Sequence, residues 1–225
     1  MKEFIRRYRH AWILFAYACI YIPWFMYLEK TVTKHYHIIH MALDDYIPFN
    51  EFFIIPYFLW FVYVSGAVLY FLFTNRSDYF RLCAFLFSGM TIFLIVSTVF
   101  PNGHHLRPLA FERDNIFTHM AAALYQTDTS TNLFPSIHVY NSLGVHFAVM
   151  NSERLSTHKW VQRGSLVLCI SIILSTVFLK QHSVFDVITA FIMAAAFYLI
   201  VYVIDYSAIA EKRRRKEWKT EHFIS

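Results

Sequence analysis

Long apolar runs constrain the fold of this chain more than any other feature of its sequence. Several runs are nearly continuous and approach the length of about 20 residues that an α-helix needs to cross a bilayer. They raise the hydrophobic fraction of the 225 residues to 57% and the aromatic fraction to 20%, which exceeds the usual composition of a soluble domain. The sequence therefore predicts an all-α, polytopic membrane protein whose main partner is the lipid bilayer.

The basic residues indicate the same class of protein. A formal net charge of +5 could indicate nucleic acid binding, but the Lys and Arg residues cluster beside the apolar runs. Such clusters are typical of the ends of membrane spans, so we expect no nucleic acid partner. The three cysteines lie inside apolar runs and are expected to pack as small hydrophobic residues without disulfides.

The apolar runs predict about six transmembrane helices in a single domain that covers residues 1–225. No internal repeat or linker divides the chain, so we expect a core over about residues 11–205 and a basic cytoplasmic tail over about 206–225. Residues 116–125 are expected to form a short helix, either on the membrane surface or within a loop. The runs cover residues 11–28, 52–73, a third that ends near 100, 136–150, 165–178 and 184–204.

The distribution of Lys and Arg predicts the orientation in the membrane. An even number of spans places both termini on one side, and most of the 20 basic residues fall in the termini and in the loops of that side. We therefore expect a protein of the cell membrane with both termini in the cytoplasm. By the same reasoning, the extracellular, non-cytoplasmic face carries Arg107, His138, Lys180 and His182.

His182 and Asp186 are the most informative polar residues in this apolar sequence. On a helix, their spacing of four residues would place both side chains on one face, so that the carboxylate accepts one ring N–H and leaves the other nitrogen free. The alternative is a structural hydrogen bond that joins two helices. Two histidines beside fixed cations suit phosphoryl transfer. The other polar residues expected near this level are His138, Ser136, Arg107 and Lys180.

Three short segments resemble, in order, the three motifs of the type 2 phosphatidic acid phosphatase (PAP2) superfamily. The first is Arg107 followed by Pro108, and the second is Pro-Ser-Ile-His at residues 135–138. The third covers residues 175–186, with a Ser at its start, His182 seven residues later and an Asp at its end. Together with the expected six spans, these motifs extend the resemblance over most of the chain.

The resemblance implies a PAP2-like helical bundle that removes phosphate through a phosphohistidine, without a metal or another cofactor. His182 would be the nucleophile, Asp186 the carboxylate that orients it, and His138 the general acid for the leaving lipid oxygen. By the same resemblance, Arg107 and Ser136 would bind the phosphate.

The chain departs from the superfamily pattern at three positions. Phe100 stands where the first motif usually has Lys, Thr176 where the third usually has Arg, and Ile137 where the second usually has Gly. Two cations are therefore missing from their usual places. The candidates to supply positive charge are Lys180, which is the strongest, Arg113 and His105.

Two reactions follow from the resemblance. The first is hydrolysis of a phosphomonoester or pyrophosphate lipid, such as a phospholipid or polyprenyl phosphate, by a lipid phosphatase. The second is transfer of a phosphoryl headgroup to a lipid alcohol, because the Lys-Gln-His segment and Thr176 resemble the inositol phosphorylceramide synthase branch, which is similar to sphingomyelin synthases. A proton-coupled carrier is a third possibility, but the spans below His182 are nearly all apolar, which counts against it.

The remaining loop histidines are expected to be solvated rather than to bind a metal ion. Neither acidic nor cysteine residues accompany them at the spacing of a metal site. Nothing in the sequence indicates an oligomeric state. These histidines are His35, His37, His40, His104, His105 and His119.

Overall fold

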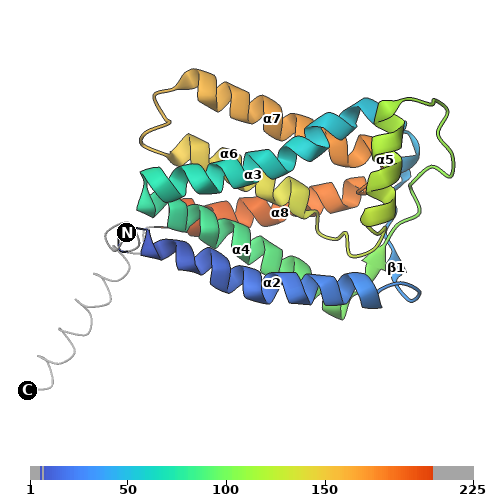
Figure 1. The fold of residues 1–225 in the computed structure, drawn as a ribbon, viewed down its shortest axis with the longest axis horizontal. Helices are drawn as coiled ribbons and strands as arrows, with labels where there is room; N and C mark the ends of the chain where they lie inside the picture. The colour runs from blue at the N-terminus through green and yellow to red at the C-terminus, as the bar shows by residue number, and fades with distance from the viewer. Residues whose placement is uncertain (1–5, 7, 205–225) are drawn as a thin grey trace, which may run out of the picture.

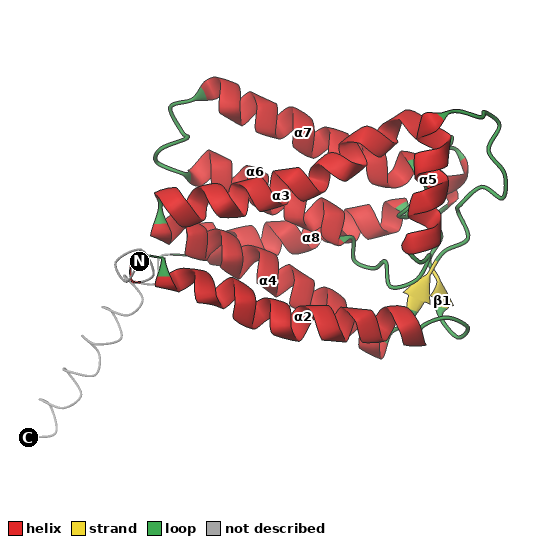
Figure 2. Ribbon diagram, viewed as in Figure 1, coloured by secondary structure: helices red, strands yellow, loops and turns green. Residues whose placement is uncertain are grey.

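The fold is a bundle of roughly aligned α-helices with one short helix across its end. The computed structural model describes residue 6 and residues 8–204. Within this part of the chain, six helices run along the long axis of the molecule, whereas α5 (Ile116–Thr127) crosses them at one end (Figure 1). Nearly all of the regular structure is helical, as Figure 2 shows. The prediction of an all-α, polytopic architecture is confirmed.

The aligned helices coincide with the predicted apolar runs. Five helical segments in the described residues are long and apolar enough to cross a membrane. The predicted basic tail, residues 206–225, lies outside the described residues. The aligned helices are α2 (Trp12–Thr31), α3 (Ile54–Thr74), α4 (Arg76–Val99), α6 (Ile137–Asn151), α7 (Lys159–Phe178) and α8 (Val184–Tyr198), which continues as a π-helix over Leu199–Val203.

The fourth predicted span, α6, differs from the other five. Its 15 residues extend only about 22 Å at 1.5 Å per residue, which is less than the roughly 30 Å hydrocarbon core of a bilayer. It contacts α3, α4, α7 and α8, and most of its side chains are buried. α6 is therefore the central helix, and these four helices pack around it.

Two glycines allow α4 and α6 to lie in close contact. A Cβ atom on Gly89 of α4 would overlap the ring of Tyr140, and one on Gly144 of α6 would overlap the ring of Phe85. The two rings stack with their centroids 4.5 Å apart. The hydroxyl of Tyr140 also donates to the Phe85 carbonyl at 3.0 Å. This fit of small residues against large ones sets the distance between α4 and α6.

The loops after α2 and α4 are joined at the end of the bundle that carries α5. There, β1 (His37–Ile38) pairs in parallel with β2 (Asn102–Gly103). This pairing brings the first polar loop of the chain beside the loop that contains the first motif. Short 3-10 helices cover Arg9–Ala11, Ala42–Asp45 and Glu51–Phe53.

The helix predicted over residues 116–125 is confirmed as α5. Asn115 caps its first turn, because its side-chain oxygen accepts from the amides of Phe117 and Thr118 at 2.9 and 3.0 Å. Apolar side chains of α5 pack against α3 and against Leu179, the first residue after α7. The apolar face of α5 is therefore at least partly buried against the bundle.

Candidate active site

The turn between α7 and α8 carries the end of the third motif and lies near α5 (Figure 1). The amides of Gln181 and His182 both donate to the Thr176 carbonyl, at 2.9 and 3.0 Å, so the chain reverses tightly. Lys180 has a φ of 52°, in the left-handed region that non-glycine residues seldom occupy. Ser183 then caps the N-terminus of α8. His182 thus lies in a constrained turn immediately before a helix.

His182, Asp186 and His138 form a chain of side-chain contacts. His182 Nδ1 lies 3.3 Å from Asp186 Oδ2, and His182 Nε2 lies 3.4 Å from His138 Nδ1. The Ser183 amide donates to the same Asp186 oxygen at 3.0 Å, so the cap of α8 also orients this carboxylate. His182 and Asp186 meet as expected, but α8 begins at Val184. Their contact therefore depends on the capping turn rather than on helical spacing.

The surroundings of His182 favour its neutral form. Burial, followed by the charge of Arg107, lowers the pKa of His182 to about 3, so its ring is neutral at pH 7. An ionised Asp186 accepts the proton on Nδ1, which leaves the lone pair on Nε2. A neutral imidazole held in one tautomer can act as a nucleophile or a base.

His138 faces the site from the first turn of α6 and contacts aromatic rings of α3. Its ring lies 4.8 Å from the ring of Tyr57 and 4.4 Å from that of Trp60, measured between centroids. The hydroxyl of Tyr57 in turn donates to Asp128, just after α5, at 3.4 Å. Aromatic side chains of α3 therefore form one wall of the site.

The guanidinium of Arg107 lies beside the turn that holds His182. Its Nη1 donates to the Asp128 carbonyl at 2.7 Å, and its Nη2 donates to the Thr129 carbonyl at 2.9 Å and to the side-chain oxygen of Gln181 at 2.7 Å. These bonds connect the end of α5 to the residue before His182. Nε of Arg107 is buried and has no hydrogen-bond partner among the described residues.

The other two predicted phosphate ligands, Ser136 and Lys180, also lie at this end. Ser136 is fully buried and caps α6, with its hydroxyl accepting from the Val139 amide at 3.4 Å. Lys180 is 9% exposed, and its Nζ donates to the Asp44 carbonyl at 2.7 Å. The structure therefore brings all six predicted site residues to one end of the bundle, and it gives each predicted phosphate ligand a protein partner.

His104 also lies beside the turn that holds His182, although the sequence analysis did not predict it there. It is 1% exposed, so the expectation of a solvated histidine is wrong here, whereas the His119 side chain is 72% exposed as expected. His104 Nδ1 accepts from the Leu106 amide at 3.2 Å, so Nε2 carries the proton and donates to the Gln181 carbonyl at 2.9 Å. Burial lowers the pKa of His104 to about 4, which keeps it neutral. The only hint in the sequence is its position three residues before Arg107.

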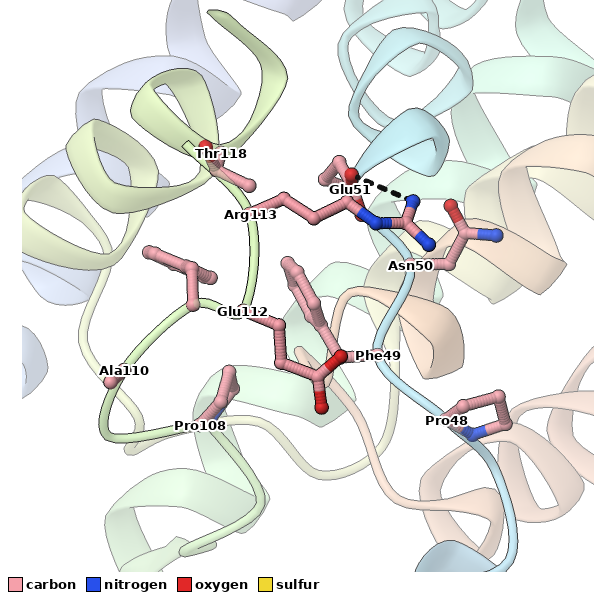
Figure 3. Close-up of a pocket in the computed structure, with 10 residues that line it drawn as sticks. Pro48, Phe49, Asn50, Glu51, Pro108, Ala110, Glu112, Arg113 and Thr118 are labelled. Atoms are coloured by element: carbon pink, nitrogen blue, oxygen red, sulfur yellow. Dashed lines mark hydrogen bonds and ion pairs between the residues drawn. The ribbon is translucent and has the colours of Figure 1, made fainter. Parts of the chain in front are cut away.

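A cavity of about 500 Å³ lies between the segments at residues 48–51 and 108–118 (Figure 3). Arg113, a weaker candidate for the missing positive charge, lines it and pairs with the buried Glu51 carboxylate at 3.2 Å (Figure 3). The described lining includes neither His182 nor His138. The charge of Arg113 is therefore offset by Glu51 on the wall of this cavity.

The fold and the site together define a class of protein. The long apolar helices are those of a multi-pass membrane protein, and two histidines and a carboxylate contact one another at one end of its bundle. Across residue 6 and residues 8–204, no group of three or more His, Cys, Asp or Glu side chains is arranged to hold a metal ion.

A comparison with known proteins matches part of the chain to a family. The sequence model of the PAP2 superfamily matches residues 113–209, a range that contains the second and third motifs and begins after Arg107. The resemblance to this superfamily is therefore confirmed. The match supports a lipid enzyme of the phosphatase or phosphotransferase type. No curated protein and no solved structure matches the chain.

Proposed function

We propose that this protein is an integral membrane lipid phosphatase that hydrolyses a phosphomonoester or pyrophosphate lipid through a phosphohistidine. The observation that carries the proposal is the chain of contacts from Asp186 through the buried His182 to His138. The match to the PAP2 superfamily supports phosphoryl chemistry. The long apolar helices support a substrate that lies in the bilayer.

The proposed reaction has two steps. First, Nε2 of His182 attacks phosphorus, the bond from phosphorus to the leaving oxygen breaks, and His138, as an imidazolium in the substrate complex, donates a proton to that oxygen and becomes neutral. Second, water attacks phosphorus and gives a proton to the neutral His138, the bond from phosphorus to Nε2 of His182 breaks, and inorganic phosphate leaves. Asp186 stabilises the positive charge that develops on the His182 ring.

The contact between the two histidine rings has a consequence for substrate binding. An attacking atom and its target in a reactive complex lie about 3 to 3.5 Å apart. His182 Nε2 and His138 Nδ1 are only 3.4 Å apart, so the rings must move apart when a phosphoryl group enters between them. This motion should involve His138 more than His182, because the turn before α8 holds His182.

The phosphate oxygens would be held by Arg107, Ser136 and Lys180. Nε of Arg107 is buried without a partner among the described residues. Lys180 uses one ammonium proton for Asp44 and retains two more. The Ser136 hydroxyl accepts from an amide, so its own proton can be donated to phosphate. These donors would offset the negative charge of the transition state.

The proposed location is the cell membrane, with both termini in the cytoplasm and the active site at the extracellular face. Two observations support it. The basic residues favour this orientation. The loops that follow α2, α4 and α7 also gather at the same end of the bundle (Figure 1), as expected for spans that alternate in direction.

The test is phosphate release in detergent by purified wild type and His182→Ala, with EDTA present. The substrates are phosphatidic acid, phosphatidylglycerol phosphate and a polyprenyl pyrophosphate. We expect release from at least one of them by the wild type and none by the variant. Release that does not need His182 would contradict the mechanism.

A second series supplies a glycerophospholipid donor with a lipid alcohol as acceptor. A phosphodiester product that requires His182, without release of inorganic phosphate, would replace hydrolysis by the phosphotransferase reaction. That reaction belongs to the branch that the Lys-Gln-His segment resembles.

A further inference from the structure

Asp44 lies in the first polar loop and binds the turn that contains His182. Its Oδ2 accepts from the Ser183 hydroxyl at 2.6 Å, and its Oδ1 accepts from the Val184 amide at 2.7 Å. Its backbone carbonyl accepts from Lys180 Nζ at 2.7 Å. Contacts from one residue therefore reach both sides of His182, although these positions are 136 to 140 residues away in the sequence.

The surroundings of the Asp44 side chain stabilise a buried carboxylate. It is 2% exposed, and a buried carboxylate is stable only when donors satisfy its oxygens. The Met41 amide supplies a third donor, to Oδ2 at 2.8 Å. The carboxylate also lies at the N-terminus of α8, where free amides and the helix dipole favour negative charge.

These contacts connect Asp44 to the orientation of His182. Ser183, which donates its hydroxyl to Asp44, donates its amide to Asp186 Oδ2, the oxygen that faces His182 Nδ1. On the other side of His182, Lys180 has the left-handed φ of 52°, an unfavourable conformation that needs support from its surroundings. Its bond to the Asp44 carbonyl supplies such support.

We propose that Asp44 is a positioning residue, which holds the turn 180–184 so that Nε2 of His182 points at the substrate phosphorus. This role rests on the proposed function, in which His182 is the nucleophile. Asp44 itself touches neither His182 nor the reacting atoms in this scheme. It acts through Ser183, Val184 and Lys180.

The chain offers a matched control in the next residue. The Asp45 side chain is 65% exposed and pairs with His40 at 2.8 Å, on the surface of the same loop. Asp45→Ala removes an identical carboxylate one position away, without removing a hydrogen bond to the turn. Asp44→Asn is the conservative variant, because an amide oxygen can still accept from Val184.

The first experiment measures hydrogen exchange in the peptide around residues 179–186 and needs no substrate. We expect Asp44→Ala to speed exchange there by about fivefold or more, since the Val184 amide and the Ser183 hydroxyl lose their acceptor, and Asp45→Ala to leave it unchanged. Equal exchange in wild type and Asp44→Ala would overturn the proposal. If Asp44→Ala does not fold, Asp44→Asn takes its place: it keeps only one acceptor oxygen, so exchange should rise by less than about fivefold, and no rise at all would overturn the proposal.

The second experiment measures kcat and KM per active site, with active sites counted by phosphohistidine formation. We expect Asp44→Ala to lower kcat about 100-fold with KM within about twofold of wild type, because a misaimed nucleophile slows the chemical step. Asp44→Asn should recover part of this loss. If Asp44 were only structural, its substitution would lower the fraction of active sites and leave kcat per site at the wild-type value. That result would overturn the positioning role.

A wild type without activity would instead refute the proposed function. The exchange comparison would still decide whether Asp44 holds the turn.

Discussion

The contact between α4 and α6 and the turn between α7 and α8 are held by different forces. In the first, Gly89 and Gly144 leave room for aromatic rings of the opposite helix. In the second, the main external contacts are hydrogen bonds to residues 180–184 from segments 74 to 140 positions away. Packing sets how far apart the helices lie, whereas the polar contacts set where a ring nitrogen points. Substitutions in the two regions should therefore affect different properties.

The largest expected effect in the turn is on turnover. His182→Ala removes the proposed nucleophile and should lower kcat by at least about 1,000-fold, while the midpoint of thermal unfolding stays close to that of the wild type. The measurement is phosphate release alongside an unfolding curve in detergent. His119→Ala, which changes an exposed histidine, is the control and should keep full activity. If His182→Ala unfolded the protein, so that the lost activity followed the lost folded fraction, the turn would affect stability as well as turnover. That result would contradict the difference between the two regions.

The role of His138 predicts a smaller effect that depends on the substrate. His138→Ala should slow release from an alkyl phosphate lipid by about 100-fold, because the leaving oxygen then departs without a proton. The loss should shrink to a few-fold for an aryl phosphate, whose leaving group needs no proton. The ratio of the two rates in variant and wild type is the measurement. An equal loss for both substrates would assign His138 to binding or packing instead.

In the packed interior, the expected effect is on stability. Gly89→Ala places a Cβ atom against the Tyr140 ring and should lower the free energy of unfolding by about 1 to 3 kcal/mol. Gly66→Ala in α3 is the matched control, because nothing lies within 4 Å of its new Cβ atom, and it should be neutral or stabilising by up to about 1 kcal/mol. Unfolding curves of both variants test this. If Gly89→Ala instead lowered kcat per folded molecule and left the stability unchanged, the contact between α4 and α6 would affect turnover. That result would contradict the difference between the two regions.

The smallest expected effect is that of chelation. Neither region is proposed to use a metal ion, so incubation with EDTA followed by assay in metal-free buffer should change kcat by less than about twofold. The control adds Mg²⁺ or Zn²⁺ back after chelation. Complete loss of activity with EDTA, restored by one of these ions, would require a metal in the mechanism.

The positions of the helices could be predicted because they depend on local sequence. A run such as residues 52–73 is apolar over its whole length, and the structure places α3 over Ile54–Thr74. The central place of α6 could not be predicted in this way. Its sequence is apolar enough to predict a span, and only its contacts with four other helices show that it is enclosed.

Part of the site could also be predicted, because its motifs are local patterns in the sequence. The motifs named His182, His138 and Asp186, and the structure brings these side chains into contact. His104 was misread as solvated, because a histidine in a polar loop looks the same in sequence whether its loop folds inward or outward. Asp44 had no sequence signal, since it lies in the first polar loop, outside the segments that resemble the motifs.

By itself, the sequence determined that this chain is a helical membrane protein with polar motifs at the ends of its spans, because hydrophobicity over about 20 residues is a local property. Only the tertiary structure decided which polar groups support the turn at His182. Asp44 and His104 reach it through loops that are joined by β1 and β2, and a hydrogen bond between such distant residues exists only once the helices have packed.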